Sequence, residues 1–116
     1  METYKGGCHC KAVRYEAQME LTKVMTCNCS HCSMKGFVLT FIPATQFTLL
    51  SGEDQLTEYR FNKNVIQHLF CRVCGVQSFG RGKGPGGIET AMINARCLDD
   101  FDYSKLPTTE YPGKDI

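Results

Sequence analysis

The cysteines of this chain are numerous and closely spaced. Of eight cysteines in 116 residues, seven stand in three short motifs: Cys8-His9-Cys10, Cys27-Asn28-Cys29-Ser30-His31-Cys32 and Cys71-Arg72-Val73-Cys74. Zinc binds thiolates tetrahedrally, with four protein ligands in a structural site and usually three, plus an open position, in a catalytic site. The motifs therefore predict metal binding, and disulfide bonds are the alternative.

A disulfide framework is typical of secreted proteins, so the N-terminal sequence bears on this alternative. Residues 1–7 contain no apolar segment that would mark a secretory signal, and no run of about 18 apolar residues predicts a membrane-spanning helix. The formal net charge of +1 does not indicate the basic surface of a nucleic-acid-binding protein. We therefore expect a cytoplasmic metal-binding protein with no nucleic-acid or membrane partner; a secreted chain that has lost its signal is the alternative.

The last motif has the form of a zinc knuckle, in which two thiols curve around a metal ion. Gly75 follows Cys74 and permits the tight turn that directs backbone amides at sulfur. The knuckle needs two more ligands, and Cys8 and Cys10 are the natural donors because both pairs adjoin segments that we expect to be strands. We therefore expect one closed structural site, formed by Cys8, Cys10, Cys71 and Cys74. A knuckle completed by part of the middle motif is the alternative.

The middle motif supplies three thiols, from Cys27, Cys29 and Cys32, and is one ligand short of a closed site. A zinc ion held by three protein ligands keeps one position open for a substrate. We therefore expect these three cysteines to form an open, catalytic zinc site. The alternative is a second closed site, completed by one of four further residues: His9, His31, His68 or Cys97.

The apolar residues recur with the period of strands. In residues 11–17, Val13, Tyr15 and Ala17 share one face, which predicts a strand. Alternation or short apolar runs predict further strands at 24–26, 37–42, 47–50, 56–61, 65–70, 76–79 and 88–93. We expect helical turns at 30–36 and 98–101, a turn at 62–64 and a flexible connection at 80–87. The sequence predicts a single, mainly β domain with one or two short helical turns.

Four stretches of the chain resemble those of a known family. They are Gly7-Cys8-His9-Cys10-Lys11-Ala12-Val13-Arg14-Tyr15, Cys27-Asn28-Cys29-Ser30-His31-Cys32, Phe70-Cys71-Arg72-Val73-Cys74-Gly75 and Asn94-Ala95-Arg96-Cys97-Leu98-Asp99. In order and spacing they resemble the glutathione-dependent formaldehyde-activating enzyme (GFA) family, which includes centromere-protein-V-like members, and the chain resembles its short members. The resemblance covers residues 6–100, which we expect to be one GFA-like zinc-binding domain, with residues 1–5 before it and a tail at 101–116.

The resemblance carries implications for fold, cofactors and activity. It implies a small β fold similar to that of the Mss4-type guanine-nucleotide-exchange proteins. It implies two zinc ions per chain. The first is structural and is held by Cys8, Cys10, Cys71 and Cys74. The second, at which a thiol substrate binds, is held by Cys27, Cys29 and Cys32. Members of the family are carbon–sulfur lyases that join glutathione and formaldehyde into S-hydroxymethylglutathione or reverse that step. The implied partners are therefore a small thiol such as glutathione and a small aldehyde.

Two functional hypotheses follow. In the first, the chain is a carbon–sulfur lyase-like enzyme: its open zinc site lowers the pKa of a substrate thiol, and the thiolate attacks an aldehyde carbon to give a hemithioacetal. No general base is identified from the sequence. Four cations are candidates to hold the carboxylates of a glutathione-like thiol: Lys35, Arg72, Arg81 and Lys83. In the second hypothesis, the chain is a non-catalytic, zinc-stabilised binding module of the Mss4-like fold.

Overall fold

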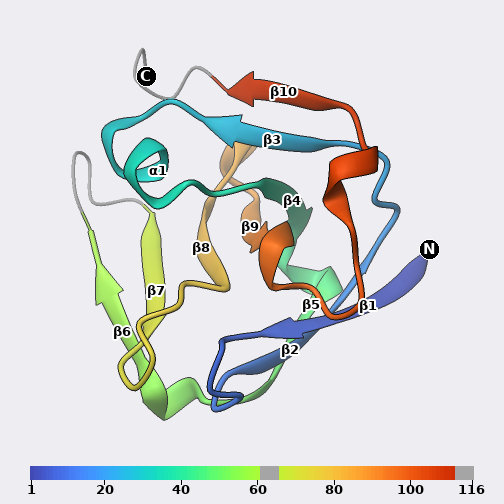
Figure 1. Ribbon diagram of the computed structural model, residues 1–116. Coiled ribbons are helices and arrows are strands. Elements are labelled where there is room, and N and C mark those ends of the chain that lie inside the picture. Colours follow the sequence, from blue (N-terminus) through green and yellow to red (C-terminus); the bar gives the residue numbers. More distant parts are fainter. Residues whose placement is uncertain (61–65, 112–116) are drawn as a thin grey trace.

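The computed structural model describes residues 1–60 and 66–111, which form two β-sheets (Figure 1). The smaller sheet is antiparallel and has the strand order β1-β2-β5. Its strands are β1 (Glu2–Gly7), β2 (Arg14–Met19) and β5 (Phe47–Ser51). The prediction of a mainly β fold is confirmed.

The larger sheet has the strand order β10-β3-β4-β9-β8-β7-β6. Its strands are β3 (Val24–Cys27), β4 (Leu39–Pro43), β6 (Leu56–Tyr59), β7 (Gln67–Cys71), β8 (Phe79–Lys83), β9 (Glu89–Asn94) and β10 (Thr108–Tyr111). β10 runs parallel to β3, whereas the other neighbouring strands are antiparallel. The sheet therefore joins the middle of the chain to its C-terminal part.

Helix α1 (Ser30–Lys35) follows β3 directly. It begins after Cys29, whose Sγ accepts a hydrogen bond from the Cys32 N–H at 3.3 Å, and it ends at Gly36, whose φ is +69°. The helical turn predicted at 30–36 is confirmed. The remaining helical segments of the described chain are single 3₁₀ turns: Ala44–Gln46, Glu53–Gln55, Pro85–Gly87, Ala95–Cys97 and Tyr103–Lys105.

The main hydrophobic core lies between the two sheets. At its centre the Tyr15 ring packs against Phe47 at 5.1 Å and Phe79 at 5.8 Å between ring centroids. The Tyr15 hydroxyl donates a hydrogen bond to the Ser78 carbonyl oxygen at 3.1 Å, which satisfies a buried polar group. The residues predicted to share the inward face of β2 and the turn before it are all fully buried: Val13, Tyr15 and Ala17.

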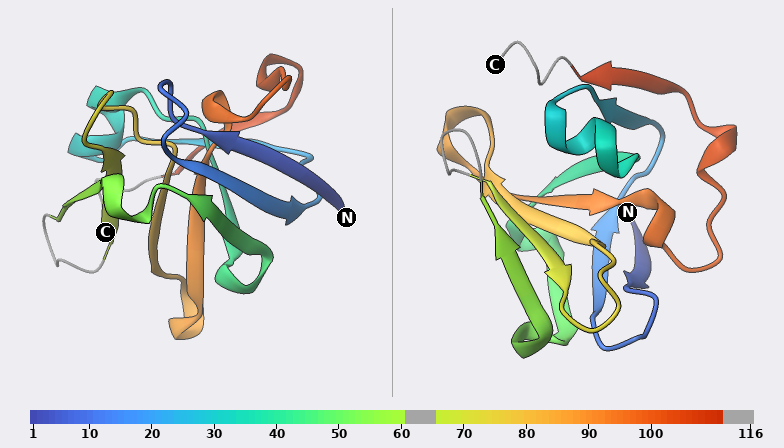
Figure 2. Two further views of the ribbon diagram at one scale, coloured as in Figure 1. Left: turned by 90° about the horizontal axis from the view of Figure 1, so that it is seen from below. Right: turned by 60° about the vertical axis from the view of Figure 1, so that its left-hand side comes forward.

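Helix α1 lies on the opposite face of the larger sheet (Figure 2). A second, smaller apolar cluster lies beside this helix. Successive residues of a strand point to opposite faces. Ile42 and Ile93 accordingly belong to the main core, whereas Leu39 packs with Cys32 and Phe37. Helix α1 and the middle cysteine motif therefore lie on the side of the larger sheet that faces away from the smaller sheet.

Several predicted elements are wrong. The strand expected at 76–79 and the connection expected at 80–87 are replaced by β8, which pairs with both β7 and β9. Its two glycines, Gly80 and Gly82, interrupt the apolar alternation that marks a strand in sequence. The helical turn expected at 98–101 lies instead at Ala95–Cys97, where the Asn94 side chain accepts a hydrogen bond from the Arg96 N–H at 3.2 Å.

Strands β1 and β10 were not predicted, because neither has a clear alternation of apolar residues. The turn expected at 62–64 lies outside the described residues. Across residues 1–60 and 66–111, the structure contains no helix with the length and apolar character needed to cross a membrane.

Candidate metal centres

Four cysteines from two motifs that are distant along the chain meet in one cluster. The Sγ atoms of Cys8, Cys10, Cys71 and Cys74 all lie within 4.8 Å of one another. Cys8 follows β1 and Cys71 ends β7, so the cluster connects the smaller sheet to the larger one. The Cys10 Sγ lies 3.6 Å from that of Cys8 and 3.7 Å from that of Cys71. A tetrahedral zinc with 2.3 Å bonds to sulfur would have edges of about 3.8 Å, so the sulfurs fit such an ion.

The knuckle loop after β7 is held by its own backbone. The Cys71 N–H donates to the Val76 carbonyl oxygen at 3.1 Å, and the Gly75 N–H donates to the Cys71 carbonyl oxygen at 2.8 Å. Gly75 has φ +81°, a left-handed conformation that a residue with a Cβ adopts only at a cost. The turn that the sequence predicted at this glycine is therefore present.

Backbone amides in this cluster favour thiolates, which are the form that binds metal. The Val73 N–H donates to the Cys71 Sγ at 3.4 Å, and the Val13 N–H donates to the Cys8 Sγ at 3.3 Å. The Val76 N–H is the main cause that lowers the pKa of the Cys74 thiol to about 6. The cluster thus combines sulfur geometry with an electrostatic environment suited to a cation.

The other three motif cysteines form a separate cluster. The Sγ atoms of Cys27, Cys29 and Cys32 lie within 4.8 Å of one another. Cys27 ends β3, Cys29 caps α1, and Cys32 is buried in the first turn of that helix. Within the described chain, no fourth Cys, His, Asp or Glu joins this group at the same distance. The structure therefore brings together three sulfurs, which could supply three of the four ligands of a tetrahedral metal ion.

The residues considered as a fourth ligand lie outside the three-cysteine cluster. The Cys97 Sγ lies 3.9 Å from the Gln77 carbonyl oxygen, and His9 is exposed. The His31 ring packs against the Phe37 and His68 rings, at 5.8 and 4.2 Å between centroids. None of these side chains is brought into the three-cysteine cluster.

The thiols of this cluster differ in their tendency to ionise. Burial raises the pKa values of Cys27 and Cys32. Burial also opposes ionisation of Cys29, but hydrogen bonds from the Cys32 backbone N–H and from the neighbouring thiols outweigh it and lower the Cys29 pKa. Three thiolates in one place repel each other, so a bound cation is the natural counter-charge.

A small cavity adjoins Cys32 on the same face of the larger sheet. Its volume is about 20 Å³, roughly the space of one water molecule. Besides Cys32, its polar lining comes from His68 on β7, Gln77 before β8 and Asn94 at the end of β9. From the sequence, His68 was a candidate only as a metal ligand, and neither Gln77 nor Asn94 was a candidate site residue. Asn94 begins a stretch that resembles the family, whereas Gln77 lies outside all four stretches.

His68 is 6 % exposed and sits between the cavity and the His31 ring. Burial is the main cause that lowers its pKa to about 4, and the positive charges of His31 and Lys35 add to it. At neutral pH the imidazole is therefore uncharged and has one nitrogen that donates and one that accepts a hydrogen bond.

Of the four cations predicted to hold carboxylates, Lys35 lies on the helix that carries the three-cysteine cluster, with its Nζ 5.6 Å from the Phe70 ring centroid. The Arg72 side chain donates to the Gln55 side-chain oxygen at 3.0 Å. Arg81 follows the cavity-lining Gly80 on β8, so it points to the opposite face, where it stacks over Phe79. Lys83 lies at the far end of β8.

These features define a class: a small, mainly β protein with two cysteine clusters that could each hold a metal ion. The chain belongs to the GFA family, because the family model described as glutathione-dependent formaldehyde-activating enzyme matches residues 3–111. The predicted family membership is confirmed.

Two relatives extend this comparison. A protein of Schizosaccharomyces pombe named as an uncharacterized lyase is 28% identical over 114 residues, which span 86% of this chain and 82% of the relative. A crystal structure of a Rhodobacter sphaeroides protein is similar with a TM-score of 0.78 and 26% sequence identity, and the match covers 90% of this chain and 99% of that one. The family and the name of the yeast relative support a lyase-like enzyme.

Proposed function

We propose that this protein is a zinc-dependent carbon–sulfur lyase-like enzyme that joins a small thiol such as glutathione to a small aldehyde such as formaldehyde, and that reverses this step. The observation that carries the proposal is the three-sulfur cluster of Cys27, Cys29 and Cys32, which could hold a metal ion with one position left for a substrate and which adjoins a cavity at Cys32. Membership in the GFA family supports the same chemistry.

In this proposal the two clusters have different tasks. The cluster of Cys8, Cys10, Cys71 and Cys74 would hold a structural zinc that ties the two sheets together. Cys27, Cys29 and Cys32 would hold the second zinc. When bound there, zinc would lower the pKa of a substrate thiol and keep it as the nucleophilic thiolate.

The surrounding residues would orient the substrates. Lys35 lies on α1, next to the cluster, where its charge can attract a carboxylate of a glutathione-like thiol. The thiolate attacks the aldehyde carbon, a sulfur–carbon bond forms, and the carbonyl electron pair moves to the oxygen. The oxygen then takes up from solvent a proton equivalent to the one that the thiol released, so that thiol and aldehyde give a hemithioacetal.

The test is the rate at which glutathione and formaldehyde interconvert with S-hydroxymethylglutathione, measured by exchange NMR. The zinc-loaded protein should accelerate the reaction above its spontaneous rate, and Cys29→Ser should remove that acceleration because a hydroxyl is a poor zinc ligand. Cys97→Ser is the matched control, since Cys97 belongs to neither cluster. A zinc-loaded protein that accelerates no reaction of small thiols with aldehydes would contradict the proposal and favour a non-catalytic binding module.

A further inference from the structure

One buried polar side chain next to the three-cysteine cluster is left without a hydrogen bond. Gln77 is 8 % exposed, and its side-chain oxygen has no hydrogen-bond partner among the residues that the structure describes. Its backbone is well held, because the Gln77 carbonyl oxygen accepts a hydrogen bond from the Asn94 side-chain amide at 3.0 Å. Buried polar side chains in folded proteins nearly always have a partner, so this oxygen is a free acceptor for a donor group that enters the cavity.

The Gln77 side chain lines the cavity that begins at Cys32. Its amide nitrogen lies beside Gly80, 3.7 Å from the position that a Cβ would occupy there. On the other sides, Phe37 and Leu39 give the cavity apolar walls. The cavity therefore combines an apolar lining, one unpaired amide oxygen and contact with Cys32, one of the three cysteines of the cluster.

We propose that this cavity is the aldehyde subsite of the proposed enzyme and that Gln77 binds the oxygen atom of the aldehyde carbon; this inference rests on the proposed function. A carboxamide can donate from nitrogen and accept at oxygen. Its N–H group donates to the carbonyl oxygen of the aldehyde as the thiolate attacks. Once that oxygen is protonated, the new hydroxyl donates to the Gln77 side-chain oxygen. Gln77 itself neither gains nor loses a proton.

The size of the cavity favours a small aldehyde. Its volume of about 20 Å³ is roughly the space of one water molecule, so a one-carbon aldehyde is the natural occupant. Gly80 lies in the lining, and a Cβ there would come within 3.0 Å of the Gln67 carbonyl oxygen and 3.6 Å of the Met92 Cε. The absence of a side chain at Gly80 therefore keeps the strands close together at this cavity.

The first experiment replaces Gln77 by a residue of similar size without hydrogen-bonding groups. Gln77→Leu should raise the KM for formaldehyde roughly two- to tenfold, the worth of one hydrogen bond, and leave the affinity for glutathione unchanged. Gln67→Leu is the control, because Gln67 bonds to Glu58 and does not line the cavity. In the wild type, the NMR signal of the Gln77 side-chain amide should shift when formaldehyde is added to the glutathione-bound protein, which reports on the contact without any rate.

The second experiment checks the fold of the two glutamine variants. Gln77→Leu and Gln67→Leu should both melt within a few degrees of the wild type, so that a change in the KM for formaldehyde reports on the subsite and not on damage to the sheet.

The outcomes separate this inference from the function on which it rests. A wild-type protein that binds glutathione but accelerates no adduct formation would overturn both. An active wild type whose Gln77→Leu variant has an unchanged KM for formaldehyde, or whose Gln77 amide signal does not move, would overturn the aldehyde subsite alone.

Discussion

Cys29 has two structural tasks at once. Its Sγ belongs to the three-cysteine cluster and also accepts the hydrogen bond that caps α1. Serine is a good helix cap but a poor zinc ligand, so Cys29→Ser separates the two tasks. We expect this variant to lose one of two bound zinc ions and all thiol binding, while its melting temperature changes by only a few degrees. Zinc analysis and a thermal melt followed by circular dichroism would measure both.

Cys29→Ala is the companion variant. It should lose the same zinc ion and, in addition, roughly 1 kcal/mol of stability, because alanine cannot cap the helix. If either variant unfolds as completely as a variant of the four-cysteine cluster, the three-cysteine cluster is structural and the distinction between the two sites fails.

The His68 imidazole provides a pH-dependent prediction. Its pKa is lowered from 6.5 to about 4 in the folded protein, mainly by burial. Between those values the unfolded chain binds a proton that the folded chain does not, so stability falls as the pH drops below about 6.5. An NMR titration should find the His68 ring uncharged at pH 6, where a free imidazole is mostly charged. A ring that titrates near 6.5 would contradict the buried environment.

At the scale of single residues, spacing along the chain accounts for only part of what could be predicted. Cys27, Cys29 and Cys32 lie within six residues, and the structure brings them together. Cys10 and Cys71 are 61 residues apart, so their group was predicted from the number of ligands that zinc needs and from the family resemblance. Gln77 and His68 could not be linked to Cys32, because they reach one cavity only through the register of β7 and β8 and the position of α1. No local pattern in the sequence encodes that arrangement.

Helix α1 is too short to be stable by itself and depends on its two ends. At its C-terminal end Gly36 has φ +69°, and its carbonyl oxygen accepts a hydrogen bond from the Arg96 side chain at 3.1 Å. No heavy atom lies within 4 Å of a Cβ placed there, so a substitution would act through the backbone alone. Gly36→Ala should therefore cost about 1 kcal/mol and Gly36→Asn less, since asparagine tolerates this conformation. Urea unfolding would test the order; equal stability of all three would contradict it.

The knuckle between β7 and β8 is the element on which stability should depend most. Structural zinc supplies roughly 10–16 kcal/mol of binding free energy in small zinc peptides, comparable to the whole stability of a small protein. Cys71→Ser should therefore unfold the protein or cause it to aggregate, as judged by circular dichroism and size-exclusion chromatography. A soluble variant that melts within a few degrees of the wild type would show that this cluster is not a structural metal site.

Elements with a clear apolar pattern were predicted, and those without it were missed. β5 and β9 lie where apolar residues alternate or run together. β8 contains Gly80 and Gly82 and so lacks a pattern of apolar side chains. It is a strand because it pairs with β7 on one side and β9 on the other. β10 is a polar segment whose place is set by parallel pairing with β3, about eighty residues earlier in the chain. Pairing between distant segments cannot be read from local periodicity.

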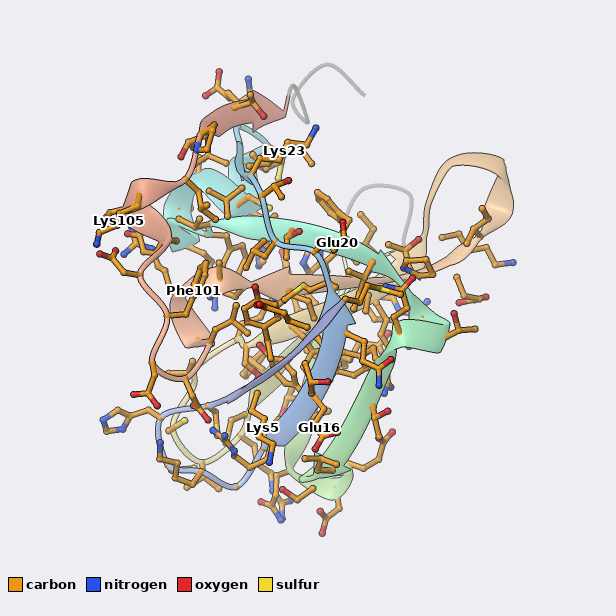
Figure 3. The ribbon with its side chains drawn as sticks, turned by 90° about the vertical axis from the view of Figure 1, so that its right-hand side faces the viewer. Lys5, Glu16, Glu20, Lys23, Phe101 and Lys105 are labelled. Carbon is orange, nitrogen blue, oxygen red and sulfur yellow. The ribbon has the colours of Figure 1, made fainter. Side chains whose placement is uncertain are left out.

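For the whole molecule, contacts within the smaller sheet and contacts beyond it add to the shared core. Figure 3 shows Lys5 of β1 beside Glu16 of β2, an ion pair within the smaller sheet whose charged groups are 3.9 Å apart. Phe101, from the segment that leads to β10, packs edge-on against Tyr4 of β1 at 5.8 Å. The four-cysteine cluster adds a link between β1 and β7. The N- and C-terminal parts of the chain therefore hold each other in place around the two clusters.

The central claim is that the three-cysteine cluster holds a metal ion with an open position that accepts a thiol. Cobalt replaces zinc in such sites, and each thiolate bound to it adds to a sulfur-to-cobalt charge-transfer band. Adding glutathione to the cobalt-loaded protein should increase this band, with an affinity that rises with pH below the pKa of the free thiol, because binding releases a proton. The Cys29→Ser variant should not respond, and the Cys97→Ser variant should respond like the wild type. A wild-type band that stays unchanged with glutathione and with smaller thiols would contradict the account.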